Sequence, residues 1–414
     1  MSLQNRDELS RLVSETVAQT PITDIHTHLF TPEFGGLLLR GIDELLTYHY
    51  LVAETFRWLK MPYEEFWRLP KREQADLIWR TLFLDHSPIS EACRGVLTVL
   101  RVFGLDPGRR DLQEYRAYFA ELPVELHVER VLQLSGVARL VMTNDPFAPE
   151  ERAVWLGGYR GDPRFHAALR LDVLLNDWEG ACRMLRGWGY EAEPALDART
   201  MAEVRRFLID WIGRMNPVYL AVSLPPEFTW PDESARSRLI AEAVLPVAAE
   251  RRLPFAMMIG VKKLVNPGLR LAGDSVGRAG LESVECLCAR FPENKFMLTV
   301  LSRENQHESC VAARKFGNLL LFGCWWFMNN PSLVEETTRM RLELLGLSFV
   351  PQHSDARVLD QLIYKWAHSR AVIAEALTEK YLDLWATGWR PTAEEIRRDV
   401  AGLFGENFWR FVGT

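Results

Sequence analysis

Eight short apolar runs alternate along this chain with stretches of helical periodicity, and this alternation predicts a (β/α)8 TIM barrel, a fold of the α/β class. Most of the runs are nearly continuous in apolar residues, as expected for parallel strands that are buried on both faces. An open, doubly wound sheet is the alternative, but such a sheet usually begins with a glycine-rich turn after its first strand. Here that place holds His26, Thr27 and His28, so the barrel is the prediction.

The first predicted strand spans residues 21–26. Seven more are predicted at residues 139–143, 166–171, 218–224, 254–260, 295–301, 319–323 and 348–352. Apolar residues at three- and four-residue spacing predict helices between them, at residues 201–215, 234–249, 304–316 and 333–345. Residues 392–411 begin with Thr-Ala-Glu-Glu, a helix-start signal, and predict a final amphipathic helix.

The first connection of the predicted barrel is unusually long, because residues 27–138 separate the first strand from the second. Most connections in compact domains are only a few residues long. Residues 41–125 are rich in helix-forming residues and predict a helical insertion over the barrel mouth, where it would form a wall of the site. We expect residues 1–414 to form one domain that includes this insertion.

Composition restricts the class of protein. The chain has 414 residues, of which 48% are hydrophobic and 25% charged, as in ordinary globular proteins. The net charge of −6 argues against a general nucleic-acid binder. No apolar stretch reaches the length of a membrane span, and no signal-peptide core is present at the N-terminus. Six irregularly spaced cysteines do not form a disulfide framework, so we expect a cytoplasmic protein without nucleic-acid or membrane partners.

Two short motifs at opposite ends of the chain predict a metal site. His26 and His28 are two residues apart at a strand end, so their side chains point to the same side. Asp355 follows the last predicted strand, which lies beside the first strand in a closed barrel. Two histidines and a carboxylate suit zinc and leave coordination positions open. Two histidines at a strand end are also compatible with a merely polar edge.

Further polar and aromatic residues follow the predicted strands, at the carboxyl ends where barrels of this kind form their active sites. They are Arg170, Asp172, Lys262, Lys263, Arg303, Trp325, Trp326, His353 and Arg357. Several arginines and a lysine pair around one metal indicate an anionic substrate. Asp355 should stay ionised beside a metal and an arginine, which suits a general base. Tyr48, His49 and Tyr50 suit either acid–base chemistry or packing at the start of a helix.

Six segments of this sequence resemble the uronate isomerases, a family of the amidohydrolase superfamily, and in particular its shorter, divergent bacterial branch. The segments are TDIHTHLF, TYHYLVAETFRW, FHAALRLD, SRENQHE, FGCWWFMNNP and PQHSDAR. The similarity runs from about residue 5 to residue 413. PQHSDAR and GCWWFMNNP are specific to the family, whereas the HTH motif is common to the whole superfamily.

The resemblance implies an aldose–ketose isomerase that converts D-glucuronate to D-fructuronate and D-galacturonate to D-tagaturonate. It implies one zinc-like divalent ion held by His26, His28 and Asp355. It further implies that Asp355 accepts the proton of the C5 hydroxyl, that Arg357 holds the C2 and C3 hydroxyls and stabilises a cis-enediol, and that Tyr50 acts at the C1 carbonyl. The implied substrate contacts are Arg170, His49, Trp326, Trp325 and Arg303.

One departure from the superfamily bears on the type of reaction. Many hydrolytic relatives carry a lysine after strand four and histidines after strands five and six, which together build a binuclear centre. This chain lacks them, and His307 lies within a predicted helix. A single metal is therefore expected, and the partner is a small hexuronate bound by a homo-oligomer. The alternatives are a mononuclear metal-dependent hydrolase or decarboxylase that acts on a sugar acid, and a sugar-acid binder without activity.

Overall fold

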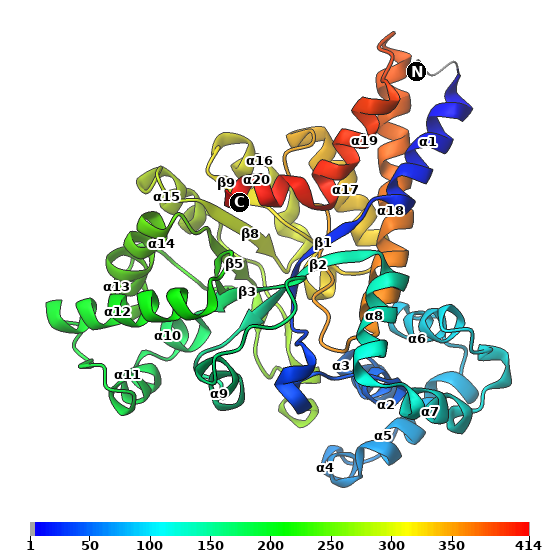
Figure 1. Ribbon diagram of the computed structural model, residues 1–414, viewed down its shortest axis with the longest axis horizontal. Helices are drawn as coiled ribbons and strands as arrows, with labels where there is room; N and C mark the ends of the chain where they lie inside the picture. Colours follow the sequence, from blue (N-terminus) through cyan, green and yellow to red (C-terminus); the bar gives the residue numbers. More distant parts are fainter. Residues whose placement is uncertain (1–4, 414) are drawn as a thin grey trace.

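The computed structural model describes residues 5–413 and contains a curled parallel sheet surrounded by helices (Figure 1). Its seven strands follow one another around the sheet in chain order. They are β1 (Ile22–Thr27), β2 (Val137–Asn144), β3 (Phe165–Arg170), β4 (Leu220–Leu224), β5 (Phe255–Ile259), β8 (Phe296–Val300) and β9 (Leu319–Leu321). All neighbouring pairs are parallel. The predicted α/β barrel class is confirmed, and each strand lies where the sequence predicted one.

The prediction of an eighth strand at residues 348–352 is wrong. A single parallel bridge joins Val350 to Phe322, with a hydrogen bond from Val350 N to Leu321 O at 3.0 Å. Pro351, whose main chain would face β1, has no N–H to donate, so regular pairing does not form on that side. Toward β9, the side chain of Gln352 continues the contact, since its Oε1 accepts from Cys324 N at 3.0 Å.

Two main-chain hydrogen bonds close the barrel between β1 and the segment that follows residue 352. Asp355 N donates to His26 O at 3.1 Å, and His28 N donates to Ala356 O at 2.8 Å. The segment therefore occupies the eighth position without regular strand geometry.

Helices cover the outside of the sheet between successive strands (Figure 1). They are α9 (Pro149–Leu156), α10 (Asp172–Asn176), α11 (Trp178–Gly187), α12 (Ala198–Met215), α13 (Ala235–Leu239), α14 (Leu245–Arg251), α15 (Glu282–Arg290), α16 (Gln306–Lys315) and α17 (Pro331–Leu345). Three of the four helices predicted here form as expected. The fourth, predicted at residues 234–249, is interrupted by a π-turn at η4 (Ile240–Val244). Pro246 explains the interruption, because it cannot donate the next helical hydrogen bond.

The predicted insertion consists of helices gathered at one side of the barrel (Figure 1). They are α2 (Ile42–Leu46), α3 (His49–Thr55), α4 (Tyr63–Arg68), α5 (Lys71–Trp79), α6 (Glu91–Val102), α7 (Leu112–Glu121) and α8 (Val124–Ser135). Asp360 ties both ends of the insertion to the barrel. Its carboxylate accepts from Gly41 N at 2.7 Å and contacts His127 Nε2 at 2.6 Å, and both Asp360 and His127 are fully buried.

Several elements were not predicted from the sequence, among them α9, α10 and α11 and three further ones. The three further ones are α1 (Arg6–Gln19), the 26-residue helix α18 (Gln361–Ala386), and a short hairpin of β6 (Val261–Lys262) and β7 (Ser275–Val276). The helices α1 and α18 pack side by side on the outside of the barrel. Among residues 5–413, no helix combines the length and the apolar character that crossing a membrane requires.

The C-terminal segment closes the bottom of the barrel, away from the carboxyl ends of the strands. It begins with α19 (Ala393–Ala401), where Thr392 and Glu395 form the predicted capping box. The expected single helix is then interrupted at η8 (Gly402–Glu406) and ends as α20 (Asn407–Val412). Phe408 and Val412 of α20 belong to the same buried cluster as the inward-facing Ile25 and Ala256 of the strands.

Replacement of Asp360 by alanine should destabilise the protein, because it leaves two buried donors, Gly41 N–H and His127, without their acceptor. Each lost partner should cost about 1–3 kcal/mol of unfolding free energy. Urea unfolding measures the change. The control is Glu242→Ala, which breaks an exposed pair with Arg238 and should cost about 0–1 kcal/mol. Equal unfolding free energies for the two variants would contradict this anchoring role.

Candidate active site and metal centre

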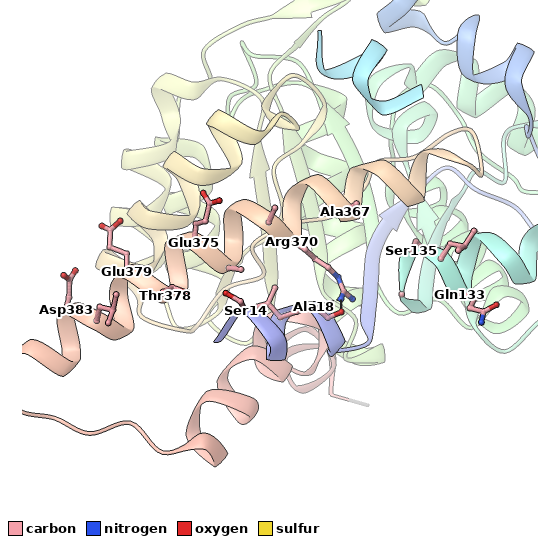
Figure 2. A pocket seen from close by; sticks show the side chains of 16 residues that line it. Ser14, Ala18, Gln133, Ser135, Ala367, Arg370, Glu375, Thr378, Glu379 and Asp383 are labelled. Carbon is pink, nitrogen blue, oxygen red and sulfur yellow. Dashed lines mark hydrogen bonds between the residues drawn. The ribbon is translucent and has the colours of Figure 1, made fainter. Parts of the chain in front are cut away.

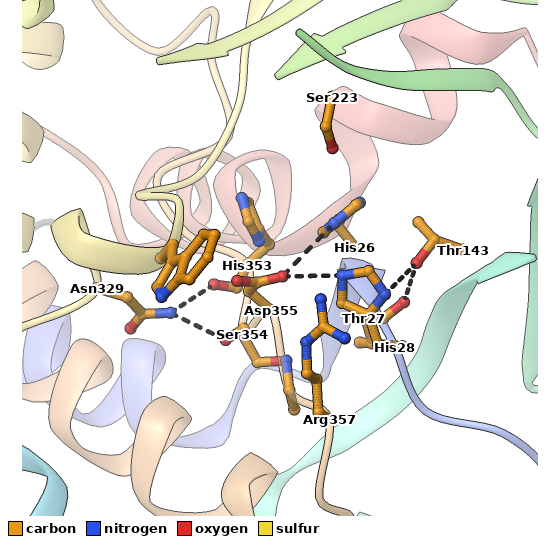
Figure 3. A network of polar contacts seen from close by, with 12 residues as sticks. His26, Thr27, His28, Thr143, Ser223, Asn329, His353, Ser354, Asp355 and Arg357 are labelled. Carbon is orange, nitrogen blue, oxygen red and sulfur yellow. Dashed lines mark hydrogen bonds and ion pairs between the residues drawn. The ribbon is translucent and has the colours of Figure 1, made fainter. Parts of the chain in front are cut away.

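Three side chains converge at the mouth of the barrel in the arrangement of a metal site (Figure 3). His26 Nε2 lies 3.6 Å from Asp355 Oδ1, and His28 Nε2 lies 3.4 Å from the same oxygen. One potential ligand atom from each of the three residues lies within 4.8 Å of the other two. The histidines come from β1 and Asp355 from the closing segment, as the sequence predicted.

The chemistry of these residues fits a divalent cation. His26 Nε2 and Asp355 Oδ1 are buried and have no hydrogen-bond partner among the described residues. Burial lowers the pKa of His26 to about 3, and burial together with Arg357 lowers the pKa of His28 well below its ordinary value. Both rings are therefore neutral, as metal ligands must be. An unpaired buried polar atom is costly, so a bound cation would satisfy atoms that the protein leaves unpaired.

Asp355 is held in a strained backbone conformation. Its φ is +50°, in the left-handed region that residues other than glycine rarely adopt. The preceding residue, Ser354, is fixed on both sides: its N–H donates to Asp24 Oδ1 at 3.0 Å, and its carbonyl accepts from Lys365 Nζ at 2.6 Å and Asn329 Nδ2 at 2.9 Å. The surrounding hydrogen bonds thus impose the conformation that turns the carboxylate toward the histidines.

Lys365 and Asp24 are buried ionisable groups on either side of Ser354. Burial lowers the pKa of Lys365 to about 8, although the nearby Asp355 and Asp24 oppose the shift. Burial raises the pKa of Asp24 to about 6, partly offset by its hydrogen bonds to Ser354 and Trp366. Lys365 could not be predicted as a buried residue, because a lysine within a helical segment is normally solvent-exposed.

A small pocket opens beside the three convergent side chains. It is lined by His28, His49, Arg170, Ser223, Met258, Val261, Lys263, Trp325, Trp326, Asp355 and Arg357. The open space is about 30 Å³, enough for about two water molecules. The side chains therefore nearly fill the pocket, and a larger ligand requires them to move apart.

Most residues predicted for the site are brought together by the fold. Arg170, His49, Trp325, Trp326 and Arg357 all line the pocket. Arg170 is oriented by Asp172, with an Nη2 to Oδ1 distance of 2.9 Å. The cationic side chains of Arg170 and Arg357 line the pocket beside the carboxylate of Asp355, whereas Lys263 pairs with Asp274 at 3.1 Å. The two arginines favour an anionic ligand.

Tyr50 lies immediately behind the pocket lining. Its hydroxyl donates to Trp326 O at 3.4 Å, and its ring lies 4.5 Å from the ring of His49. Burial raises the pKa of Tyr50 well above its ordinary value, so the phenol carries its proton. The neighbouring Tyr48 is the N-cap residue of α3, and its side chain is buried beside the ring of Tyr50. Both interpretations of this segment thus apply, since the three side chains begin a helix and also adjoin the pocket.

Arg303 is the one predicted contact that the structure places elsewhere. It belongs to the turn after β8, η6 (Arg303–Asn305), and its guanidinium pairs with Glu336 of α17 at 2.9 Å on the surface. The chain turns outward immediately after the strand, so the side chain points away from the mouth. The pocket-lining residues Ser223, Met258 and Val261 were not predicted as site residues. Their positions at the ends of β4 and β5 were the only signal, because their side chains carry no distinctive chemistry.

A second groove lies outside the barrel, between α1, α8 and α18 (Figure 2). Its volume is about 1040 Å³, far larger than that of the pocket at the mouth. Arg370 lies in this groove and donates to Val17 O and Thr20 O at the end of α1. Among residues 5–413, no predicted site residue lines the groove. The arginine in the groove bonds main-chain carbonyls at the end of α1. We therefore place the active site at the mouth, where the groups with chemistry converge.

The chain is similar over its full length to proteins of known structure. No protein-family model and no curated protein matches it. Among solved structures, it is similar to a uronate isomerase from Bacillus halodurans C-125, with 59% sequence identity, a TM-score of 0.98, and coverage of 100% of this chain and 98% of that chain. A uronate isomerase from Thermotoga maritima shares the fold at 16% identity, with a TM-score of 0.77 and coverage of 99% and 100%. A glucuronate isomerase from Caulobacter crescentus does so at 16% identity and the same TM-score, with coverage of 98% and 94%.

Removal of both histidines, in His26→Ala/His28→Ala, should abolish stoichiometric binding of a divalent metal, because it deletes two of the three convergent ligands. Metal analysis of purified, dialysed protein measures the content per chain. The control is His307→Ala, which removes an exposed histidine from α16 and should leave the metal content unchanged. Full metal content in the double variant would refute the assignment.

Proposed function

The chain belongs to the uronate isomerase family, and on this basis we propose that it interconverts the aldose and ketose forms of hexuronates. The proposed pairs are D-glucuronate with D-fructuronate and D-galacturonate with D-tagaturonate. The observation that carries the proposal is the full-length match, at 59% identity, to the uronate isomerase of Bacillus halodurans C-125. The pocket supports it independently, because cationic side chains suited to a sugar acid surround a metal-type triad.

We propose that His26, His28 and Asp355 hold one divalent ion, and that this ion is zinc. The ligand set of two imidazole nitrogens and one carboxylate oxygen suits zinc. The ion would polarise substrate oxygen atoms as a Lewis acid. Among the described residues, only this one group of histidine, cysteine and acidic side chains could hold a metal. A mononuclear centre is therefore proposed, without the second ion of the binuclear hydrolases.

Arginine side chains are proposed to bind and orient the substrate. Arg357 and Arg170 line the same pocket, and Asp172 fixes the guanidinium of Arg170. The planar fork of arginine can bond two oxygen atoms at once, which suits a carboxylate or a pair of neighbouring hydroxyls. We assign the C2 and C3 hydroxyls to Arg357. We assign Arg170, His49, Trp325 and Trp326 to the remaining substrate contacts, since all four line the pocket.

The isomerisation moves one proton from C2 to C1 and one between the oxygens of these carbons. We propose that Asp355 accepts the proton of the C5 hydroxyl, so that this oxygen can assist removal of the proton from C2. Arg357 then stabilises the cis-enediol through its positive charge. Tyr50 keeps its proton at neutral pH, and we propose that it donates this proton to the C1 oxygen and takes one back from the C2 hydroxyl, which becomes the ketone.

The reaction can be separated from hydrolysis by running it backwards. Zinc-loaded protein mixed with D-fructuronate alone should yield D-glucuronate, because an isomerisation consumes no water and is reversible. Proton NMR follows the appearance of the aldose. If the protein leaves both uronates unchanged but hydrolyses a lactone or an amide, the isomerase proposal is wrong and Asp355 activates water instead.

Tyr50→Phe removes the proposed proton shuttle but keeps the ring that packs against His49. Groups that act in general acid–base catalysis contribute roughly 10² to 10⁴ in rate, so kcat should fall by about that factor. KM should change far less, because the phenol is one of several contacts. Tyr63→Phe is the matched control, since that hydroxyl contacts Asn266 in the hairpin region and should leave kcat intact. A wild-type kcat in Tyr50→Phe would remove Tyr50 from the mechanism.

A further inference from the structure

Each histidine of the triad has a second ring nitrogen that faces a buried hydroxyl. His26 Nδ1 lies 3.2 Å from the hydroxyl oxygen of Tyr219, and His28 Nδ1 lies 3.0 Å from that of Thr143. Tyr219 is fully buried, and Thr143 is 2% exposed. Neither residue lines the pocket, so neither is a candidate for contact with the substrate.

The proton of each hydroxyl is already committed to a main-chain carbonyl. Tyr219 donates to Ile25 O at 2.8 Å. Thr143 donates to Thr27 O at 2.8 Å, as Figure 3 shows beside its contact with His28. A hydroxyl has one proton and a carbonyl oxygen can only accept, so the hydroxyl oxygen must act as the acceptor toward the histidine. The proton in each histidine contact therefore belongs to Nδ1.

The same three-part arrangement occurs twice along β1. In both cases a histidine Nδ1 donates to a hydroxyl, which donates to the carbonyl of the residue before that histidine. The two hydroxyls come from different elements, because Thr143 belongs to β2 and Tyr219 directly precedes β4. Side chains two residues apart on a strand point to the same side, so the same kind of contact can form at both histidines. Because two different elements supply the same kind of contact, we infer that both contacts have the same role.

We propose that Tyr219 and Thr143 are positioning residues that fix His26 and His28 in the Nδ1–H tautomer, so that both rings present the Nε2 lone pair to the metal ion. A neutral imidazole carries one proton, so an Nδ1–H ring has a bare Nε2. Both Nε2 atoms face Asp355 Oδ1, and that of His26 has no hydrogen-bond partner among the described residues. This inference rests on the proposed metal centre, but not on the identity of the substrate.

The choice of a hydroxyl as acceptor has a consequence for the charge of the site. Metal-bound histidines commonly donate their other N–H to a carboxylate, a carbonyl or water, and these partners orient the ring and tune its strength as a ligand. A hydroxyl relay to the main chain orients the ring without adding negative charge. Asp355 thus remains the one anionic group among the three proposed ligands and their two hydroxyl partners.

The first test measures zinc affinity, with Zn²⁺ alone as the probe and a chelator in competition. Tyr219→Phe and Thr143→Val each remove one hydroxyl with little change of shape, and each should weaken zinc binding by about 10- to 100-fold. Thr143→Ser keeps the hydroxyl and should bind zinc like the wild type. Tyr115→Phe is the matched control for the tyrosine, because that buried hydroxyl donates to Asp106 O at 2.8 Å inside the insertion. Circular dichroism of the metal-free proteins checks folding.

The second test needs no substitution of either hydroxyl. In metal-free protein labelled with ¹⁵N at its nine histidines, two-bond ¹H–¹⁵N spectra distinguish Nδ1–H from Nε2–H rings. His26 and His28, assigned through the loss of their signals in His26→Ala and His28→Ala, should both be Nδ1–H, and zinc should shift their Nε2 resonances. An Nε2–H tautomer at either ring would overturn the inference.

The outcomes separate this inference from the proposed function. If the wild-type protein binds no zinc, the metal centre fails and this inference fails with it. If the wild type binds zinc and both Tyr219→Phe and Thr143→Val bind it equally well, the metal centre stands and the positioning role is wrong. Weak binding in these two variants, together with wild-type binding in Thr143→Ser and Tyr115→Phe, supports the role.

Discussion

The site depends on the way the barrel closes between its first strand and the segment after residue 352. Two hydrogen bonds, from Asp355 N to His26 O and from His28 N to Ala356 O, bring the two ends of the sequence together. Pro351 has no N–H with which to pair regularly with β1, and the chain turns at Asp355, where φ is +50°. That turn directs the carboxylate to the histidines. The break in the eighth strand and the metal-type triad are therefore one feature.

A costly local conformation has to be compensated by its surroundings. Ser354 meets this need, since Asp24, Asn329 and Lys365 all bond its main chain. Lys365 and its neighbour Trp366 lie on α18, and Trp366 Nε1 donates to Asp24 Oδ2 at 2.8 Å. The long helix thus holds the closing segment from outside the barrel. Asp360, which anchors the insertion, is the N-cap residue of the same helix, so the insertion and the closing segment share one support.

Part of the site could be predicted from the sequence, because it follows from strand geometry. Alternation along β1 places His26 and His28 on one side. Active sites of such barrels form at the carboxyl ends of the strands, and this rule selects Arg170 and Arg357. The same rule wrongly placed Arg303 in the site, because a residue that follows a strand can turn outward. The sequence did not show this turn, since the surface partner of Arg303, Glu336, is distant in sequence. Helix α18 was missed for a different reason. Its buried polar residues, such as Lys365, obscure the amphipathic pattern on which helix prediction depends.

The hydroxyl partners of the histidines show where sequence reading ends and structure becomes necessary. Tyr219 and Thr143 lie in or beside apolar strands, where a tyrosine or threonine is ordinarily read as packing. Their function follows from the direction of single protons, which is fixed only once the carbonyls of Ile25 and Thr27 are seen to accept them. The protein leaves His26 Nε2 and Asp355 Oδ1 unpaired and satisfies the atoms around them. Two buried polar atoms without partners lower the stability of the metal-free protein. A bound ion would pair with both atoms, and its binding would stabilise the native state.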